Sequence, residues 1–156
     1  MNIKDSNIAI IHDWFLEKSF GGSEKVTFIL NDLLNERYST PDIFSLTSNI
    51  KSLKIKSFKE SNIKTSFIQS LPFGKTNVQS YLPILPYAIE QFDLNEYDLI
   101  ISSSHAIAKG VISSPDQLHI SYVHTPMRYA WDQMNTYLRK STLSKFGFEI
   151  PIRFML

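Results

Sequence analysis

Short apolar runs, each ending in polar residues, recur along the chain at residues 8–11, 42–46, 99–102 and 120–123. A continuous apolar run of this length is typical of a strand that is buried on both faces of a parallel sheet. We therefore expect four parallel strands. Each of them ends where the sequence turns polar.

The segments between these runs carry a different period. After Gly21 and Gly22, apolar residues recur at helical spacing, with Ser23 as the expected N-cap: Val26, Ile29, Leu30, Leu33 and Leu34. Residues 78–92 are helical in pattern but contain Pro83 and Pro86, which predicts two short helices or one kinked helix. Strands that alternate with helices predict an α/β fold, a Rossmann-like parallel sheet with helices on both faces.

Composition narrows the class of protein. A chain of 156 residues fits one domain, and a content of 43% hydrophobic and 20% charged residues is ordinary for a globular protein. The net charge of +1 gives no global argument for nucleic acid as a partner. The absence of cysteine excludes disulfides, thiolate metal sites and cysteine nucleophiles. The first apolar run is too short for a signal peptide or a membrane span, so a cytoplasmic location is expected.

Polar residues with useful chemistry stand at the ends of the expected strands. His12 follows the first strand, Ser104 lies in a serine-rich loop after the third, and His124 follows the fourth, just before Pro126. Proline cannot extend a strand, so His124 is held on a sharp turn. Ligand crevices of open α/β sheets lie at the carboxyl ends of the strands. We expect these residues and Gly22 to face a common crevice.

The glycine-rich turn before the first helix has two interpretations. Glycine at a helix start lets a ligand approach unpaired backbone N–H groups, which would suit a diphosphate. A flexible turn with an ordinary cap explains the same residues. The turn is not a dinucleotide fingerprint, because G-x-G-x-x-G is absent and the glycines do not adjoin the strand. Similarly, Gly74, Lys75 and Thr76 mimic the end of a P-loop, but Gln69 stands where its first glycine belongs.

Histidines and serines allow two further site hypotheses. Ser104 and His105 offer a hydroxyl and an imidazole for a serine hydrolase, although G-x-S-x-G does not occur and adjacent residues seldom face each other. His12, His105 and His124 are candidates for a metal site, but no H-x-x-x-H spacing supports them. D-x-D is missing as well. The site is therefore expected to work without a metal or other cofactor.

Two other features concern surfaces and sugar rings. Glu60 is the only acid in a stretch with many lysines, which is either a solvated face or a contact with anionic lipid at the membrane: Lys51, Lys54, Lys56, Lys59 and Lys64. Leu53 and Ile55 alternate there like an edge strand, which favours the solvated face. Trp14 and Trp131 follow the first and last strands, where each either stacks on a sugar ring or packs under a loop.

A resemblance to a known family covers nearly the whole chain. In order along the sequence, the matching segments are I-H-D-W, G-G-S-E-K-V, P-D-I-F-S-L, Y-L-P-I-L-P-Y-A-I-E-Q-F-D-L, Y-D-L-I-I-S-S-S-H-A-I-A-K-G-V and H-T-P-M-R-Y-A-W-D. Their order and spacing resemble those of family 4 glycosyltransferases, which have the two-domain GT-B architecture. Residues 1–156 are similar to the N-terminal, acceptor-side domain. Such enzymes are retaining mannosyl- and related transferases that move a sugar from a GDP- or UDP-sugar to a lipid-linked or polysaccharide acceptor.

The resemblance also implies roles for single residues. His124 would lie beside the transferred sugar as the catalytic residue, and Gly21 and Gly22 beside the donor phosphates. The acceptor-side wall is assigned by position alone, to His12, Ser104, Lys109, Arg128 and Trp131.

In the family, the basic residues and the E-x7-E glutamates that hold the donor belong to a C-terminal domain, and after Trp131 the sequence has neither the E-x7-E motif nor space for a second domain. We therefore expect the chain to be inactive without a C-terminal half, which a separate chain or a longer gene product would supply. The apolar residues 148–156 either indicate an interrupted chain or dock on its own core. A non-catalytic module that binds glycan or glycolipid is the alternative function, and the serine hydrolase is the second.

Overall fold

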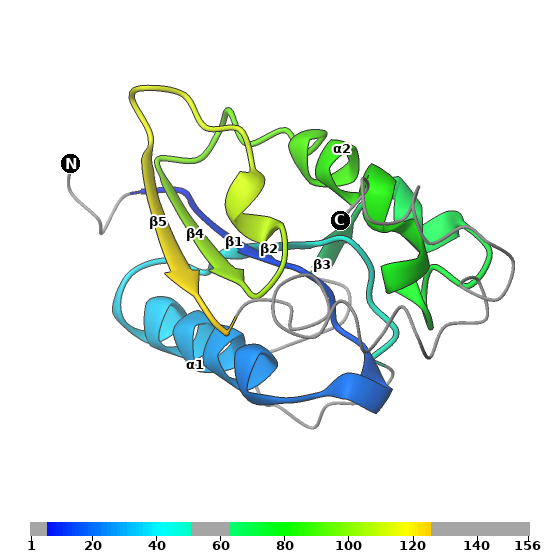
Figure 1. The fold of residues 1–156 in the computed structure, drawn as a ribbon. Coiled ribbons are helices and arrows are strands. Elements are labelled where there is room, and N and C mark those ends of the chain that lie inside the picture. The colour runs from blue at the N-terminus through cyan, green and yellow to red at the C-terminus, as the bar shows by residue number, and fades with distance from the viewer. Residues whose placement is uncertain (1–5, 51–62, 126–156) are drawn as a thin grey trace, which may run out of the picture. The chain divides into compact units, whose positions relative to one another are not determined.

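A computed structural model describes residues 6–50 and 63–125 of the chain (Figure 1). Its centre is a five-stranded sheet of β1 (Ile8–His12), β2 (Asp42–Ser45), β3 (Ile63–Thr65), β4 (Leu99–Ser104) and β5 (Leu118–Val123). The strand order is β3-β2-β1-β4-β5, and every neighbouring pair is parallel. The expected α/β class with a parallel, Rossmann-like sheet is confirmed.

Helical segments lie on both faces of this sheet (Figure 1). The long helix α1 (Gly22–Arg37) covers one face, and the short helix α2 (Leu85–Glu90) lies on the opposite face. Four 3₁₀ helices complete the described part, at Glu17–Ser19, Phe67–Ser70, Val78–Ile84 and Ala108–Gly110. Of the two alternatives predicted for residues 78–92, two short helices and not one kinked helix are observed, with Pro83 inside a 3₁₀ helix and Pro86 in the first turn of α2.

The core against α1 follows from the parallel register. Ile10 pairs with Ile43 on one side and with Ile101 on the other, so these side chains share a face. They pack with Phe28 and Leu34 of α1. Burial of this apolar face is the main driving force for docking the helix, at about 25 cal/mol per Å². It also places the start of α1 next to the end of β1.

The expected start of α1 is corrected. Gly21, not Ser23, is the N-cap residue, and the helix begins at Gly22. Glu24 reaches back and accepts the backbone N–H of Gly21 at 2.9 Å, while Ser23 Oγ donates to the same carboxylate at 2.9 Å. The carboxylate thus accepts the backbone N–H of the N-cap residue, as in a capping box. Ser23 is the second residue of the helix and does not cap it.

Strand boundaries differ from the sequence pattern, most clearly at β3, β4 and β5. β4 runs on through Ser104, so residues 102–104 belong to a strand and not to a loop. β5 already begins at Leu118, and it is largely exposed instead of buried on both faces, because it lies at the edge of the sheet. β3 was not expected. It has only three residues, one of them Lys64, at the edge of the sheet, and so short a segment gives no alternating pattern.

The remaining predictions about organisation concern residues outside the described part. The chain separates into two compact units, residues 1–124 and 125–156, and nearly all of the second unit lies outside the description. The single domain over residues 1–156 therefore stays a prediction. Within residues 6–50 and 63–125, no helix is both long enough and apolar enough to cross a membrane.

Candidate functional site

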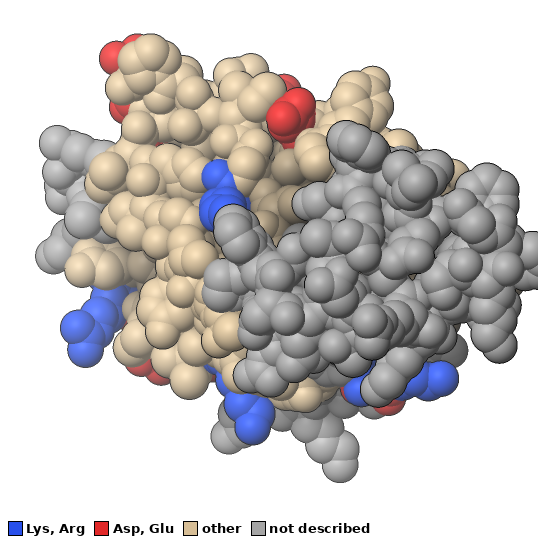
Figure 2. All heavy atoms as spheres, in the orientation of Figure 1, with Lys and Arg blue, Asp and Glu red and all other residues tan. Residues whose placement is uncertain are grey.

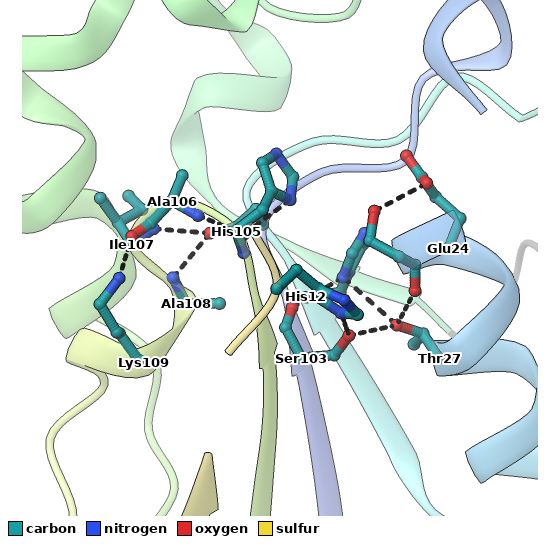
Figure 3. Close-up of polar contacts among 12 residues, drawn as sticks. His12, Glu24, Thr27, Ser103, His105, Ala106, Ile107, Ala108 and Lys109 are labelled. Carbon is teal, nitrogen blue, oxygen red and sulfur yellow. Dashed lines mark hydrogen bonds and ion pairs between the residues drawn. The ribbon is translucent and has the colours of Figure 1, made fainter. Parts of the chain in front are cut away.

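The direction of the chain through the sheet reverses between β1 and β4. From β1 the chain proceeds outward to β2 and β3, and it then returns to the other side of β1 to form β4 and β5. In open α/β sheets such a switch point is where ligands bind, at the carboxyl ends of the strands. Here the last residue of β1, His12, pairs in register with Ser103 of β4. This position also lies next to the start of α1 (Figure 3).

A hydrogen-bonded group of side chains, which we call the switch-point cluster, occupies this position: His12, Thr27, Ser103 and His124 (Figure 3 labels the first three). Thr27 Oγ1 lies 2.9 Å from Ser103 Oγ, and Ser103 Oγ lies 2.9 Å from His124 Nε2. The structure thus links His12 and His124 through hydrogen bonds. Ser103 connects them, and it had not been selected from the sequence.

His12 is fully buried, and its environment fixes its tautomer. Nδ1 lies 2.9 Å from the carbonyl oxygen of Ser103, which can only accept, so Nδ1 carries the hydrogen. Burial lowers the pKa of His12, while the nearby carboxylates of Asp13 and Glu24 oppose that shift. The imidazole is therefore neutral. Its Nε2 atom is buried and has no hydrogen-bond partner in the described part of the chain.

His124 follows β5 and is half-buried. Its backbone N–H donates to the carbonyl oxygen of Ser104 at 2.9 Å, which holds the residue against β4. Burial lowers the pKa of the His124 imidazole, His105 lowers it further, and Asp13 and Glu24 act in the opposite direction. Like His12, this side chain is neutral at physiological pH and able to accept a proton.

Asp13 fixes the loop that follows β4. Its buried carboxylate accepts the backbone N–H groups of four consecutive residues, at 2.7, 2.9, 2.7 and 2.7 Å from His105, Ala106, Ile107 and Ala108 (Figure 3). A charged acceptor with several backbone donors makes strong hydrogen bonds. In the same loop, Lys109 Nζ donates to the carbonyl oxygen of Ala106 at 2.7 Å. The loop is therefore rigidly attached to the end of β1.

The glycines at the start of α1 differ in what they offer a ligand. The N–H of Gly21 already donates to Glu24. Gly22 is exposed, and a Cβ added there would meet no atom within 4 Å. Its N–H is one of the first in α1, and the helix itself supplies no acceptor for these groups. Of the two predicted phosphate-binding residues, Gly22 is the one with room for a close ligand.

The structure does not join Ser104 and His105 as a nucleophile and its base. Ser104 Oγ is buried without a hydrogen-bond partner in the described part, and His105 Nδ1 lies 3.0 Å from Asp13 Oδ2. Trp14 is also buried, and its ring meets His105 edge-on at 4.6 Å between centroids. Packing under a loop is thus its observed role. Among the described residues, no three His, Asp or Glu side chains converge as metal ligands.

Other predicted residues lie elsewhere. Lys64 belongs to β3 and pairs with Asp42 at 3.0 Å, whereas the other lysines of that stretch lie outside the described residues. Arg128 and Trp131 of the predicted acceptor-side wall lie outside them too. On the face in Figure 2, the Lys and Arg side chains of the described part are scattered and form no continuous basic patch.

Gly74 has a packing role. A Cβ at this position would lie 1.9 Å from the carbonyl oxygen of Ile68, so only glycine fits the turn. This close approach explains the glycine without a phosphate. The turn also lines a shallow surface pocket, together with Phe73 and Lys75, and that pocket shares no residue with the switch-point cluster.

Sequence reasoning missed several residues of the site. Asp13 directly follows His12, the last residue of β1, and that position was an available signal. Thr27 and Glu24 lie in the amphipathic pattern of α1, where nothing in the sequence separates a buried polar residue from a solvated one.

Comparisons of the chain with protein-family models, with curated proteins and with solved structures gave no match.

Proposed function

We propose that this chain is the acceptor-side half of a retaining glycosyltransferase with two Rossmann-like domains, and that the complete enzyme moves a sugar, with mannose as the first candidate, from a nucleotide donor. The observation that carries the proposal is the position of the switch-point cluster. Two neutral histidines from β1 and from the end of β5 meet through Ser103, beside the first turn of a long helix.

Glycosyl transfer requires different functions of the groups at this edge of the sheet. Transfer breaks the bond between the anomeric carbon and the diphosphate and forms a bond from that carbon to an acceptor oxygen. The acceptor hydroxyl loses its proton, and the departing diphosphate gains negative charge that must be stabilised. In the proposal, His124 lies beside the transferred sugar and the N–H of Gly22 lies beside the diphosphate, at the positive end of the α1 dipole.

The acceptor would be lipid-linked or a polysaccharide, and the loop held by Asp13 would form part of its wall. Ser104, Lys109 and His12 belong to this side in the proposal. The donor-binding glutamates and basic residues would come from a second, C-terminal half. With only part of the phosphate contacts, these 156 residues alone would bind a nucleotide sugar weakly.

Calorimetric titration of the chain with GDP- and UDP-sugars tests whether donor binding requires the C-terminal half. We expect weak binding and negligible turnover for the chain alone, and transfer to a lipid-linked acceptor once a separately expressed C-terminal half of a family 4 enzyme is added. A Kd of ~1 µM or below for the chain alone would show that the donor site lies in this half. Glycan binding without transfer in the presence of the second half would favour the binding module instead.

A further inference from the structure

The hydrogen atoms of the switch-point cluster can be assigned from its heavy-atom contacts. Each short contact needs one hydrogen between its two atoms, and each hydroxyl supplies only one. Thr27 Oγ1 lies 3.0 Å from the carbonyl oxygen of Ser23 and 2.9 Å from Ser103 Oγ. Ser103 Oγ in turn lies 2.9 Å from His124 Nε2. These contacts form a continuous chain from the first turn of α1 to His124.

The carbonyl group of Ser23 determines which atom donates in each of these hydrogen bonds. A carbonyl oxygen can only accept, so the single hydrogen of Thr27 must point to Ser23. The contact between Thr27 and Ser103 then needs the hydrogen of Ser103. That leaves the contact between Ser103 Oγ and His124 Nε2 without a hydroxyl hydrogen, so Nε2 itself must donate.

The opposite assignment of donors is inconsistent with the contact between Thr27 and Ser23. If Thr27 donated to Ser103 and Ser103 to His124, then Thr27 Oγ1 and the carbonyl oxygen of Ser23 would face each other as two acceptors at 3.0 Å. His12 does not change the assignment. Its Nδ1 donates to the carbonyl oxygen of Ser103 and lies 3.3 Å from Thr27 Oγ1, which accepts the same hydrogen.

We infer that Thr27 and Ser103 are positioning residues that hold neutral His124 as its Nε2–H tautomer, so that its Nδ1 lone pair accepts a hydrogen bond from a ligand hydroxyl. The tautomer stands on the contacts alone, whereas the identity of the ligand as a sugar rests on the proposed function. His124 in this tautomer thus suits an O–H group of a sugar, while a diphosphate, which offers only acceptors, belongs at Gly22.

The tautomer can be read directly from the ring nitrogens of His124 by long-range ¹H–¹⁵N NMR on the 156-residue chain, at a pH well above the ordinary imidazole pKa of about 6.5. We expect a protonated Nε2 and an unprotonated Nδ1. Thr27→Val removes the acceptor of the Ser103 hydrogen, which then points to His124, so the Nδ1–H form should become the major one. Thr27→Ser keeps the hydroxyl and should restore the wild-type spectrum.

A neighbouring pair on the same strands provides the control. Ser102 Oγ lies 2.9 Å from His119 Nε2 on the other face of the sheet, so Ser102→Ala should change the signals of His119 and leave those of His124 as they are. A wild-type His124 with a protonated Nδ1 would overturn the inference, and that measurement needs no variant. Unchanged His124 signals in a folded Thr27→Val protein would overturn it too. Neither result depends on whether the chain binds nucleotide sugars.

Discussion

The backbone N–H of Ala108 donates to Asp13 Oδ1 at 2.7 Å, which ties the loop after β4 to the residue after β1 across 95 positions of sequence. Three further N–H groups of that loop bind the same carboxylate. Two neighbouring strand ends are thus joined by one buried side chain. The shape of this edge of the sheet therefore depends on Asp13.

Asp13→Asn should destabilise the protein by about 3 kcal/mol, because the amide NH₂ would face backbone donors and leave buried N–H groups without an acceptor. Denaturant unfolding of both proteins measures this loss. Asp116, which is exposed, is the matched control, and Asp116→Asn should stay within about 0.5 kcal/mol of wild type. Equal stabilities of the two variants would mean that the carboxylate does not hold the loop.

Gly22→Ala should have opposite effects on folding stability and on ligand binding. No atom lies within 4 Å of a Cβ at this position, and alanine is the better helix former, so the variant should be up to about 1 kcal/mol more stable. The added methyl group would stand where the proposal puts a diphosphate. We therefore expect weaker binding of nucleotide sugars in the assembled enzyme, measured by calorimetry. Unaltered affinity would remove Gly22 from the donor site.

His124→Ala should lower turnover of the assembled two-domain enzyme much more than it lowers folding stability. The side chain is half-buried and joins the protein through Ser103, so its removal leaves a small structural defect, whereas a preorganised group at a reacting centre contributes a few kcal/mol to the barrier. kcat and the unfolding midpoint are the two measurements. His119→Ala is the control, since His119 lies at the opposite end of β5 and binds Ser102. Equal losses of kcat in both variants would make His124 a structural residue.

Stability should fall as the pH is lowered below about 6.5, the pKa of histidine in an unfolded chain. Burial lowers the pKa of His12 in the folded protein, so the unfolded state binds more protons in this range and acid favours unfolding. The slope for one such group is at most about 1.4 kcal/mol per pH unit. His12→Asn keeps a donor for the carbonyl oxygen of Ser103 and cannot titrate. Its unfolding free energy should vary less between pH 6.5 and 5 than that of wild type.

The sequence alone determined the class of the fold. The apolar runs that become β1, β2 and β4 are largely buried in a parallel sheet, and such strands are recognisable because few other structures bury so many consecutive residues. The run at residues 120–123 also forms a strand, but β5 lies at the edge of the sheet and is largely exposed. The change to helical spacing after Gly22 likewise identified α1, and the two prolines identified the break before α2. The polar residues at strand ends indicated the edge where His12 and His124 now lie.

Tertiary structure decided which polar residues work together. Ser103 was one of three consecutive serines, and only the register of β4 against β1 selects it as the partner of both histidines. Thr27 is an ordinary helix residue until α1 docks and brings it to Ser103. Asp13 binds a loop more than ninety residues away. Side-chain hydrogen bonds of this kind depend on distances that arise when distant segments pack, and a local pattern of apolar and polar positions carries no information about those distances.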